Sequence, residues 1–224
     1  MKEVSVSGAI MEAARTMKLQ LEQEQAAAME EHFRLLQHWN RAVSLTSVRN
    51  PKAAVTLYTE PLQILDLMPE RGRGKLVDLG SGGGFPGLIL ALLRPSWTVL
   101  LVERAARKVA FLAEAARKLG LRGVQVLERD LQSYSDLLDA WSFDILTLKA
   151  VGAFDLALTL LDQKGTAGSL AILLAGQDGV SAVEQRLPQY AGRLEQAEIR
   201  PIVGRERSFA SVIRKVSACP DCST

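Results

Sequence analysis

The sequence predicts an α/β fold in which helices cover a mostly parallel sheet of the Rossmann-like type. Three observations support this prediction. From residue 75 onward, short apolar segments typical of buried parallel strands alternate with segments of helical periodicity. A glycine-rich turn joins the first of these strands to the helix that follows it. Acidic residues stand at the carboxyl ends of successive strands, the edge where ligands bind in sheets of this kind.

The composition is typical of a soluble globular protein, with 48% hydrophobic and 23% charged residues in a chain of 224. No apolar run approaches the ~18 residues that a membrane helix requires, and the first residues lack the apolar segment of a signal peptide. We therefore expect a cytoplasmic protein with no membrane partner. Lys and Arg number 27 against 25 Asp and Glu, a balance that neither requires nor excludes a nucleic-acid partner.

The length suits one compact unit with two parts and a tail. Residues 1–70 are expected to form an N-terminal helical cap, because this segment shows helical periodicity and no strand pattern. Within it, Gln20 to Asn40 is predicted to be a docking helix, and a second helix is expected to begin at Pro51. The apolar face of the docking helix would contain Leu21, Met29, Phe33, Leu36 and Trp39. Residues 71–217 are expected to form the main domain and residues 218–224 a tail.

The segment from Lys75 to Gly87 is the centre of the prediction. Its first five residues are a short, mainly apolar run suited to a buried parallel strand. Pro86 suits the beginning of the next helix, because its missing N–H needs no partner there. Between them stand glycines that permit positive φ angles and a close approach of ligand to backbone, namely Gly80, Gly82, Gly83 and Gly84. This is the construction of a nucleotide-type cofactor site.

Two cofactor classes use such a turn. The spacing Gly82-x-Gly84-x-x-Gly87 matches the dinucleotide fingerprint and favours an NAD-dependent oxidoreductase. The register Asp78-x-Gly80-x-Gly82-x-Gly84 instead places a carboxylate before the first glycine. That carboxylate would repel a pyrophosphate but would accept hydrogen bonds from a positively charged amino group. S-adenosyl-L-methionine carries such a group and no phosphate, so we favour it as the cofactor.

Two further acids are placed to hold an adenosine. Glu103 follows the apolar strand at 98–102, where it would accept from both ribose hydroxyls in either cofactor class. Asp130 follows the strand-like run at 124–128 and is expected to accept from the adenine amino group. The alternative for each is an exposed loop carboxylate, and this alternative has more weight for Asp130.

The remaining segments complete the alternation of strands and helices. We predict helices at 106–119 (with Gly120 as the cap), near 131–140 and at 153–161, strands at 143–149 and 169–174, and a terminal antiparallel pair at 194–200 and 208–216. Right-handed crossovers bring the carboxyl ends of parallel strands to one edge of the sheet. We expect four charged residues at that edge: Asp78, Glu103, Asp130 and Lys149.

The two cysteines, Cys219 and Cys222, both lie in the tail. A C-x-x-C pair occurs in zinc sites and redox motifs, but a zinc site would need a second pair and redox motifs lie at a helix N-terminus. We therefore expect no metal and a tail without a function. The absence of cysteine from the rest of the chain also argues against chemistry that requires a thiolate, such as carbon-5 methylation of pyrimidines.

Three parts of the chain carry a resemblance to a known family. They are residues 39–49 (WNRAVSLTSVR), residues 78–87 (DLGSGGGFPG), and the loop after Glu103 with the pairs Arg107-Lys108, Phe111-Leu112 and Glu128-Arg129. Together they are similar to the RsmG (GidB) family, over roughly residues 30 to 215. The resemblance implies a Rossmann-like class I S-adenosylmethionine-dependent methyltransferase with an N-terminal helical cap. It also implies that the enzyme forms N7-methylguanosine in 16S ribosomal RNA of the small subunit.

The motifs and the resemblance together suggest roles for individual residues. The cofactor-binding residues are expected to be Asp78, Gly80, Ser81, Gly82, Gly84, Phe85, Glu103, Arg104, Arg129 and Asp130. The catalytic residues are expected to be Lys149 and Arg129. Further candidates for contacts with RNA phosphates, each otherwise a solvated surface charge, are Arg41, Arg49, Arg107, Lys108, Arg205 and Arg207. We expect the protein to be a monomer.

The predicted chemistry needs little from the protein beyond alignment, because guanine N7 already has an in-plane lone pair. The chain departs from the family on the substrate side, however. The family's Arg-His-x-x-Asp-Ser is Thr56 to Pro61 here, with Glu60 as the acid, while Lys149 replaces an arginine and Ala175 a lysine. Lysine does not provide the planar fork of arginine. A methyltransferase that acts on another RNA, a protein or a small molecule is therefore an alternative.

Overall fold

Seven strands form one sheet in the computed structural model, which describes all residues except 1–4, 49, 70–71, 131–140, 150–151 and 217–224. The strand order is β3-β2-β1-β4-β5-β7-β6. The strands are β1 (Lys75–Leu79), β2 (Thr98–Glu103), β3 (Val124–Glu128), β4 (Phe143–Lys149), β5 (Gly165–Gly176), β6 (Leu194–Pro201) and β7 (Ser208–Lys215). Neighbours among β1 to β5 are parallel, whereas β7 is antiparallel to both β5 and β6. The chain order reverses at β1, and ligands bind beside such a reversal.

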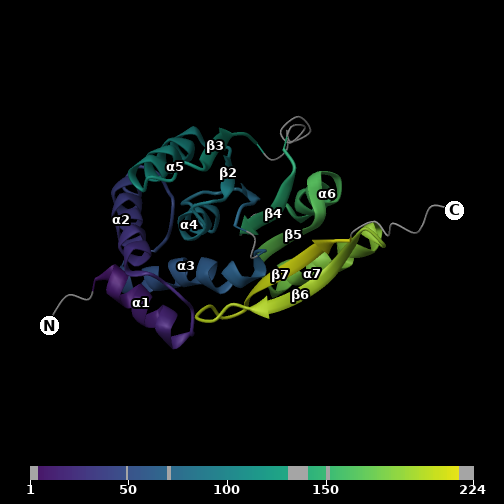
Figure 1. The fold of residues 1–224 in the computed structure, drawn as a ribbon, viewed down its shortest axis with the longest axis horizontal. Helices are drawn as coiled ribbons and strands as arrows, with labels where there is room; N and C mark the ends of the chain where they lie inside the picture. The colour runs from purple at the N-terminus through teal and green to yellow at the C-terminus, as the bar shows by residue number, and fades with distance from the viewer. Residues whose placement is uncertain (1–4, 49, 70–71, 131–140, 150–151, 217–224) are drawn as a thin grey trace.

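Helices cover both faces of the sheet (Figure 1). They are α1 (Val6–Thr16), α2 (Gln23–Trp39), α3 (Pro51–Gln63), α4 (Gly87–Leu93), α5 (Ala106–Lys118), α6 (Phe154–Lys164) and α7 (Gln177–Arg186), with short 3-10 turns at Leu65–Leu67 and Leu187–Tyr190. Adjacent strand residues point to opposite faces. Leu76 accordingly packs in one hydrophobic cluster with residues of α1 to α5, and Val77 in another with residues of α6 and α7. The result is three layers.

The N-terminal helices belong to the first of these layers. Met29 of α2 is completely buried in the same cluster as Leu88 of α4. Trp39, at the end of α2, packs against this cluster and donates its indole N–H to a carboxylate oxygen of Glu114 on α5, 2.9 Å away. The helical cap is therefore joined to the sheet layer by apolar packing and by a polar contact.

The alternation predicted from the sequence is confirmed, including the terminal antiparallel pair. Two helices were not predicted, α1 and α7. The docking helix begins at Gln23, so Leu21 lies before it rather than on its face. β5 begins at Gly165, earlier than expected, because its first residues extend along β4. The helix expected near 131–140 and the cysteine tail lie outside the described residues.

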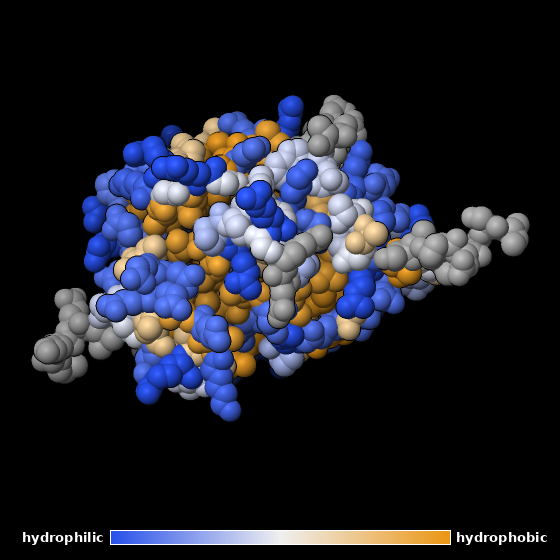
Figure 2. Space-filling view, viewed as in Figure 1, coloured by the Kyte–Doolittle hydropathy of each residue, from blue (hydrophilic) through white to orange (hydrophobic). Residues whose placement is uncertain are grey.

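The face shown in Figure 2 is mainly hydrophilic at its periphery, and hydrophobic residues are visible towards its middle. Within the described part of the chain, each helix is too short or too polar to cross a bilayer. The same residues contain no cluster of His, Cys, Asp or Glu side chains that could hold a metal ion.

Candidate active site

The turn between β1 and α4 is held by backbone hydrogen bonds to the neighbouring strand. The N–H groups of Gly80 and Ser81 both donate to the carbonyl oxygen of Val102 on β2, over 2.8 and 3.1 Å. Gly80, Gly82 and Gly84 have positive φ angles of 72°, 51° and 87°. Residues with a Cβ seldom adopt this conformation, which explains the glycine spacing. The turn thus folds back across the carboxyl end of the sheet.

The segment at 39–49 supports this turn. The side-chain oxygen of Asn40 accepts from the N–H groups of Leu45 and Thr46, and its NH₂ donates to the Thr46 carbonyl oxygen, all within 3.1 Å. A Cβ added at Gly83 would lie 3.3 Å from the carbonyl oxygen of Leu45, so the two loops are in contact. Of the RNA candidates in this segment, Arg41 is exposed and Arg49 lies outside the described residues.

Asp78 is the buried carboxylate of the site, with 1% of its surface exposed. Its Oδ1 accepts a hydrogen bond from the Thr147 hydroxyl at 2.7 Å. Its Oδ2 is buried and has no hydrogen-bond partner among the described residues. Burial raises the pKa of Asp78, and the Thr147 hydroxyl, Ser81 and the nearby backbone N–H of Gly87 oppose this effect, although the Gly87 N–H does not reach hydrogen-bond geometry with Oδ2. A buried acceptor without a donor is costly, so a ligand that brings a charged N–H would complete the site.

Gly87, the first residue of α4, allows the helix to begin directly against Asp78. A Cβ added at Gly87 would lie only 2.5 Å from the Cβ of Asp78. The third glycine of the dinucleotide register is therefore explained by packing between α4 and β1, a use that does not depend on which cofactor binds.

Glu103, at the end of β2, is 7% exposed and lies beside the turn. Its two carboxylate oxygens accept from the N–H groups of Gly82 and Ala105, each at 3.0 Å. Each carboxylate oxygen has a second lone pair, which leaves acceptor capacity for ribose hydroxyls. Glu103 therefore has a structural task that sequence reasoning missed, because it ties the glycine turn to the loop after β2.

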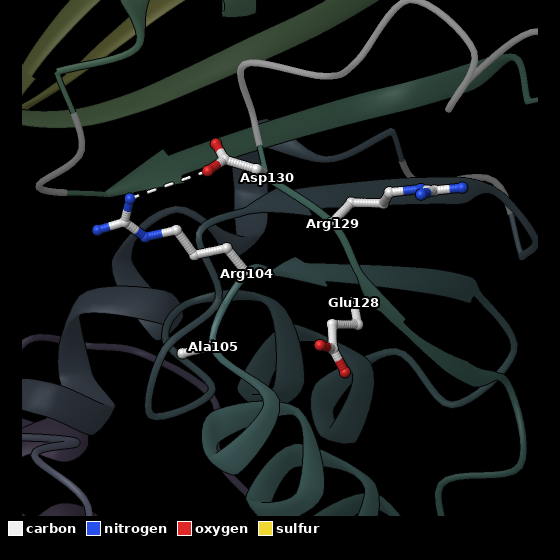
Figure 3. A pocket seen from close by; sticks show the side chains of 5 residues that line it. All are labelled: Arg104, Ala105, Glu128, Arg129 and Asp130. Atoms are coloured by element: carbon white, nitrogen blue, oxygen red, sulfur yellow. Dashed lines mark ion pairs between the residues drawn. The ribbon is translucent and has the colours of Figure 1, made fainter.

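A pocket of about 440 Å³ opens next to Glu103, between the ends of β2 and β3. Its lining residues are Arg104, Ala105, Glu128, Arg129 and Asp130. Figure 3 shows Arg104 and Asp130 pointing towards each other across the pocket, with 4.0 Å between guanidinium and carboxylate. Both side chains are largely exposed, so this ion pair is a weak constraint. Asp130 and Arg104 thus both line this pocket, and their roles in binding an adenosine stay a prediction.

The groups around the turn fit S-adenosyl-L-methionine. The unpaired oxygen of Asp78 could accept from the amino group of the cofactor, and Glu103 has acceptor capacity for the ribose. The pocket beside Asp130 adjoins Glu103 and could hold the adenine. A dinucleotide fits less well, because the buried Asp78 carboxylate would face the pyrophosphate. The described residues thus favour the first of the two cofactor classes.

Lys149, at the end of β4, belongs to a buried cluster of charges on the other side of the turn. Its ammonium group is ion-paired with Oε1 of Glu60 on α3, and Oε2 of Glu60 is 2.9 Å from Nε of Arg205. The side chains of Lys149 and Glu60 are only 16% and 3% exposed. Burial lowers the pKa of Lys149, and the charge of Glu60 opposes this effect. Lys149 also lies 5.7 Å from the ring centre of Phe85, next to the glycine turn.

Arg129 and Lys149, the two residues expected to be catalytic, are not brought together. Arg129 follows β3, and two strands, β2 and β1, separate β3 from β4. Three strand spacings amount to about 14 Å. The Arg129 side chain is exposed and points away from Arg104 and Asp130 (Figure 3). We therefore keep Arg129 as a candidate for cofactor or RNA contacts and do not propose a catalytic role for it.

Sequence reasoning missed a buried aromatic group behind the turn. His32 of α2 is completely buried, and its Nδ1 is 2.8 Å from the hydroxyl oxygen of Tyr58 on α3. The rings of His32 and Tyr58 both lie edge-on to Phe85, with ring centres 5.3 and 5.2 Å from it. Burial lowers the pKa of His32 to about 4, so the imidazole is neutral at physiological pH. This group supports the turn from the helical side.

Comparison with known proteins now adds to this geometry. The family model described as GidB, rRNA small subunit methyltransferase G, matches residues 25–203. The chain belongs to the GidB family. The match covers the docking helix from its third residue, the glycine turn and the Lys149 strand, and it ends two residues before Arg205.

Two relatives illustrate the similarity of this chain to the family. Ribosomal RNA small subunit methyltransferase G of Nitrosospira multiformis is 40% identical over 112 residues, 50% of this chain and 51% of that protein. The protein of the same name from Halorhodospira halophila is 34% identical over 184 residues, 82% of this chain and 77% of that protein. In the first and several other comparisons, the matched part spans only about half of the relative's length.

Solved structures agree on the fold. A SAM-dependent methyltransferase from Aquifex aeolicus superposes with a TM-score of 0.58 at 15% sequence identity, over 73% of this chain and 93% of that one. At this identity the likeness concerns the fold alone. It confirms the Rossmann-like architecture predicted from the alternation of strands and helices.

Proposed function

We propose that this protein is an S-adenosyl-L-methionine-dependent methyltransferase that forms N7-methylguanosine in small-subunit ribosomal RNA. The observation that carries the proposal is the unpaired buried oxygen of Asp78 within the glycine turn of a GidB family chain. This oxygen calls for a cationic nitrogen, which S-adenosyl-L-methionine has. The names of the relatives, which refer to small-subunit ribosomal RNA, support the substrate.

The bound cofactor would supply a methyl group on a positively charged sulfur. The residues of the chain then have to orient rather than to move protons, because guanine N7 attacks with an existing lone pair. Asp78 would hold the amino group of the cofactor and Glu103 its ribose. Lys149 and Phe85, whose ammonium group and ring centre lie 5.7 Å apart next to the glycine turn, would line the acceptor side. We propose no general base.

RNA binding would rest on exposed cations. Among the candidates, Arg41, Arg107, Arg129 and Arg207 are exposed and free to contact phosphates, which position a substrate without reading its bases. Arg205 is different, because its guanidinium is ion-paired with Glu60. We further propose that residues 1–70 and 71–217 act as one compact monomer in the cytoplasm.

A methyltransferase with another substrate is the second candidate. It is favoured by the cluster of Glu60 and Lys149, since the family resemblance led us to expect an aspartate and an arginine at these two positions. The two candidates share the cofactor and differ in the acceptor.

The test is transfer of a tritiated methyl group to small ribosomal subunits that lack the modification, followed by mapping of any N7-methylguanosine. We expect incorporation at a single guanosine, and we expect S-adenosylhomocysteine to bind more tightly than NAD in titration calorimetry. Tighter binding of NAD would refute the cofactor assignment. Tight binding of S-adenosylhomocysteine without incorporation into the subunits would support the second candidate.

A further inference from the structure

In the cluster of Glu60, Lys149 and Arg205, the Glu60 carboxylate can accept hydrogen bonds in addition to its two ion pairs. Apart from the two ion pairs, Glu60 Oε1, Lys149 Nζ and Arg205 Nε have no hydrogen-bond partners among the described residues. An ionised carboxylate has about four lone-pair sites, and one on each oxygen faces a cation here. Each oxygen faces one cation and keeps a second lone pair, so the Glu60 carboxylate has capacity for two further hydrogen bonds.

A cavity lies directly beside this carboxylate. It has a volume of about 130 Å³, and Glu60, Lys149 and Arg205 contribute to its wall together with Ala175 and Phe209. The wall is thus partly charged and partly apolar, as in sites that bind small molecules or bases. The Glu60 side chain is 3% exposed, so a ligand must enter the cavity to reach it.

The position of Arg205 is fixed by contacts between α3 and the loop that carries it. The side chain of Gln63 donates to the carbonyl oxygen of Val203 at 3.1 Å and accepts from the N–H of Val203 at 2.8 Å. Glu60 and Gln63 lie one turn apart on α3. The same helix therefore positions the carboxylate and the loop that holds its second cation.

The cavity is on the acceptor side of the cofactor site. Thr147 and Lys149 are two residues apart on β4, so their side chains leave the same face about 7 Å apart. Thr147 donates to Asp78, the proposed anchor of the amino group, whereas Lys149 contacts Glu60. The cofactor anchor and the cavity are thus neighbours along one strand.

Guanine presents matching groups along one edge. Its N2 amino group and N1–H are adjacent donors, and O6 and N7 follow as acceptors. The carboxylate of Glu60 would accept from N2–H and N1–H, and Lys149 would donate to O6. N7 would then point towards the methyl group beside Phe85. Adenine has no pair of adjacent donors at this edge, so the same arrangement would reject it.

The charges are also suited to the reaction. The N7 lone pair forms the new N–C bond, the electron pair of the broken S–C bond stays on sulfur, and no proton leaves. The positive charge thereby moves from sulfur to the purine ring. The charge of Lys149 alone would repel the positive charge that forms on the purine ring. The negative charge of Glu60, ion-paired with Lys149, offsets this repulsion.

We propose that Glu60 is the specificity-determining residue that reads the N1–H and N2–H donors of the target guanine. The inference rests on the proposed function. It extends that function from the class of reaction to the atoms by which the acceptor base is selected. It is also separate from cofactor binding, since the ion pairs of Glu60 in the described part of the chain are with Lys149 and Arg205 and not with the glycine turn.

The experiment compares small subunits that carry guanosine or inosine at the position identified by mapping. Inosine lacks only the N2 amino group. For the wild-type protein we expect kcat/KM to be roughly 10- to 100-fold lower with inosine, as for loss of one half of a bidentate base contact. For Glu60→Gln we expect a similarly reduced kcat/KM with guanosine and no further penalty with inosine, while the affinity for S-adenosylhomocysteine is unchanged.

The matched control is Glu206→Gln, which changes an exposed acid next to Arg205 and should keep the wild-type preference for guanosine. If wild type methylates both subunits equally, or if Glu60→Gln keeps the full inosine penalty, this inference is wrong while the proposed function stands. If wild type transfers no methyl group to either subunit, the proposed function fails and this inference with it. Should Glu60→Gln not fold, the wild-type comparison of the two subunits decides.

Discussion

Thr147 and Asp78 lie opposite each other on the adjacent parallel strands β4 and β1, and the Thr147 hydroxyl donates to Oδ1 of Asp78 over 2.7 Å. This bond orients the carboxylate so that its second oxygen is left for a ligand. In the proposed function, the strand that carries Lys149 therefore also orients the carboxylate that would hold the amino group of the cofactor.

Asp78→Asn should separate stability from cofactor binding. The amide keeps an oxygen for Thr147 but loses the charge, so affinity for S-adenosylhomocysteine should fall roughly 10- to 100-fold, as expected for a hydrogen bond between charged groups. Burial raises the pKa of Asp78 in the folded protein above its value in the unfolded chain. The free energy of unfolding therefore falls as the pH rises from the unfolded-state pKa to the folded-state pKa of this group. The variant, which cannot ionise, should have a higher free energy of unfolding than wild type at pH 7.

Calorimetry and urea denaturation at pH 7 measure both effects. Asp66→Asn is the matched control, because the Asp66 side chain is 67% exposed and pairs with Arg200 away from the turn. It should bind S-adenosylhomocysteine as wild type does. Unchanged affinity of Asp78→Asn would show that the amino group is held elsewhere.

Glu103→Ala should weaken the cofactor and also loosen the turn. The substitution removes the acceptor of the N–H groups of Gly82 and Ala105. We expect the free energy of unfolding to fall by about 1 to 3 kcal/mol, in addition to a loss of S-adenosylhomocysteine affinity. Denaturation and calorimetry are compared with Glu195→Ala, whose carboxylate pairs with Arg214 on the surface of β6 and β7. A variant of full stability would contradict the structural role of Glu103.

Gly87→Ala should destabilise the protein although it adds only one methyl group. The new methyl group would lie 2.5 Å from the Cβ of Asp78, so α4 must move away from β1. Overpacking of this kind costs roughly 1 to 3 kcal/mol, and the displaced turn should also bind S-adenosylhomocysteine poorly. Gly72→Ala, whose Cβ meets no atom within 4 Å, should change the free energy of unfolding by less than about 0.5 kcal/mol. Equal effects of the two substitutions in thermal denaturation would argue against the close contact.

His32 should make stability depend on pH below neutrality. Its pKa is about 4 in the folded protein and about 6.5 for an unperturbed histidine, so between these pH values the unfolded chain binds a proton that the folded protein does not. The contribution is fully present above about pH 6.5 and is lost as the pH falls towards 4. A shift of this size corresponds to about 3 kcal/mol.

His32→Gln, which keeps a partner for Tyr58, should remove this pH dependence from urea denaturation curves recorded between pH 4.5 and 7. The control is His38→Gln, since His38 is exposed on the same helix and is the second of the two histidines. The idea fails if both variants retain the wild-type dependence.

The sheet, and the places of Asp78 and Glu103 at the carboxyl ends of its strands, were predictable because their signals are local. Apolar runs, glycine spacing and an acid after a strand are all visible within a few residues of Asp78 and Glu103. Parallel strand topology then brings their carboxyl ends together without further information. The helix α1 also had a local signal, since Ser5 caps it by accepting from the N–H of Gly8, but its single short apolar stripe is weak.

The acceptor half was not predictable in the same way. Glu60, Lys149 and Arg205 stand far apart in the sequence and meet only when α3, β4 and the loop before β7 pack together. Periodicity predicts that a helix such as α3 is buried on one side, but not which distant cation a buried acid on that side will meet. His32 was missed for a similar reason, because no neighbouring motif distinguishes it and its partner Tyr58 lies on another helix.

The place of β7 between β5 and β6 affects how the protein is made. β7 is the last strand of the sheet in the sequence, yet it pairs on both sides. While the chain is being synthesised, β5 presents an open edge until Ser208–Lys215 has emerged, and such edges pair readily with other chains. We expect the nascent protein to depend on chaperones during this interval, and the cavity beside Glu60 to form only in its final step.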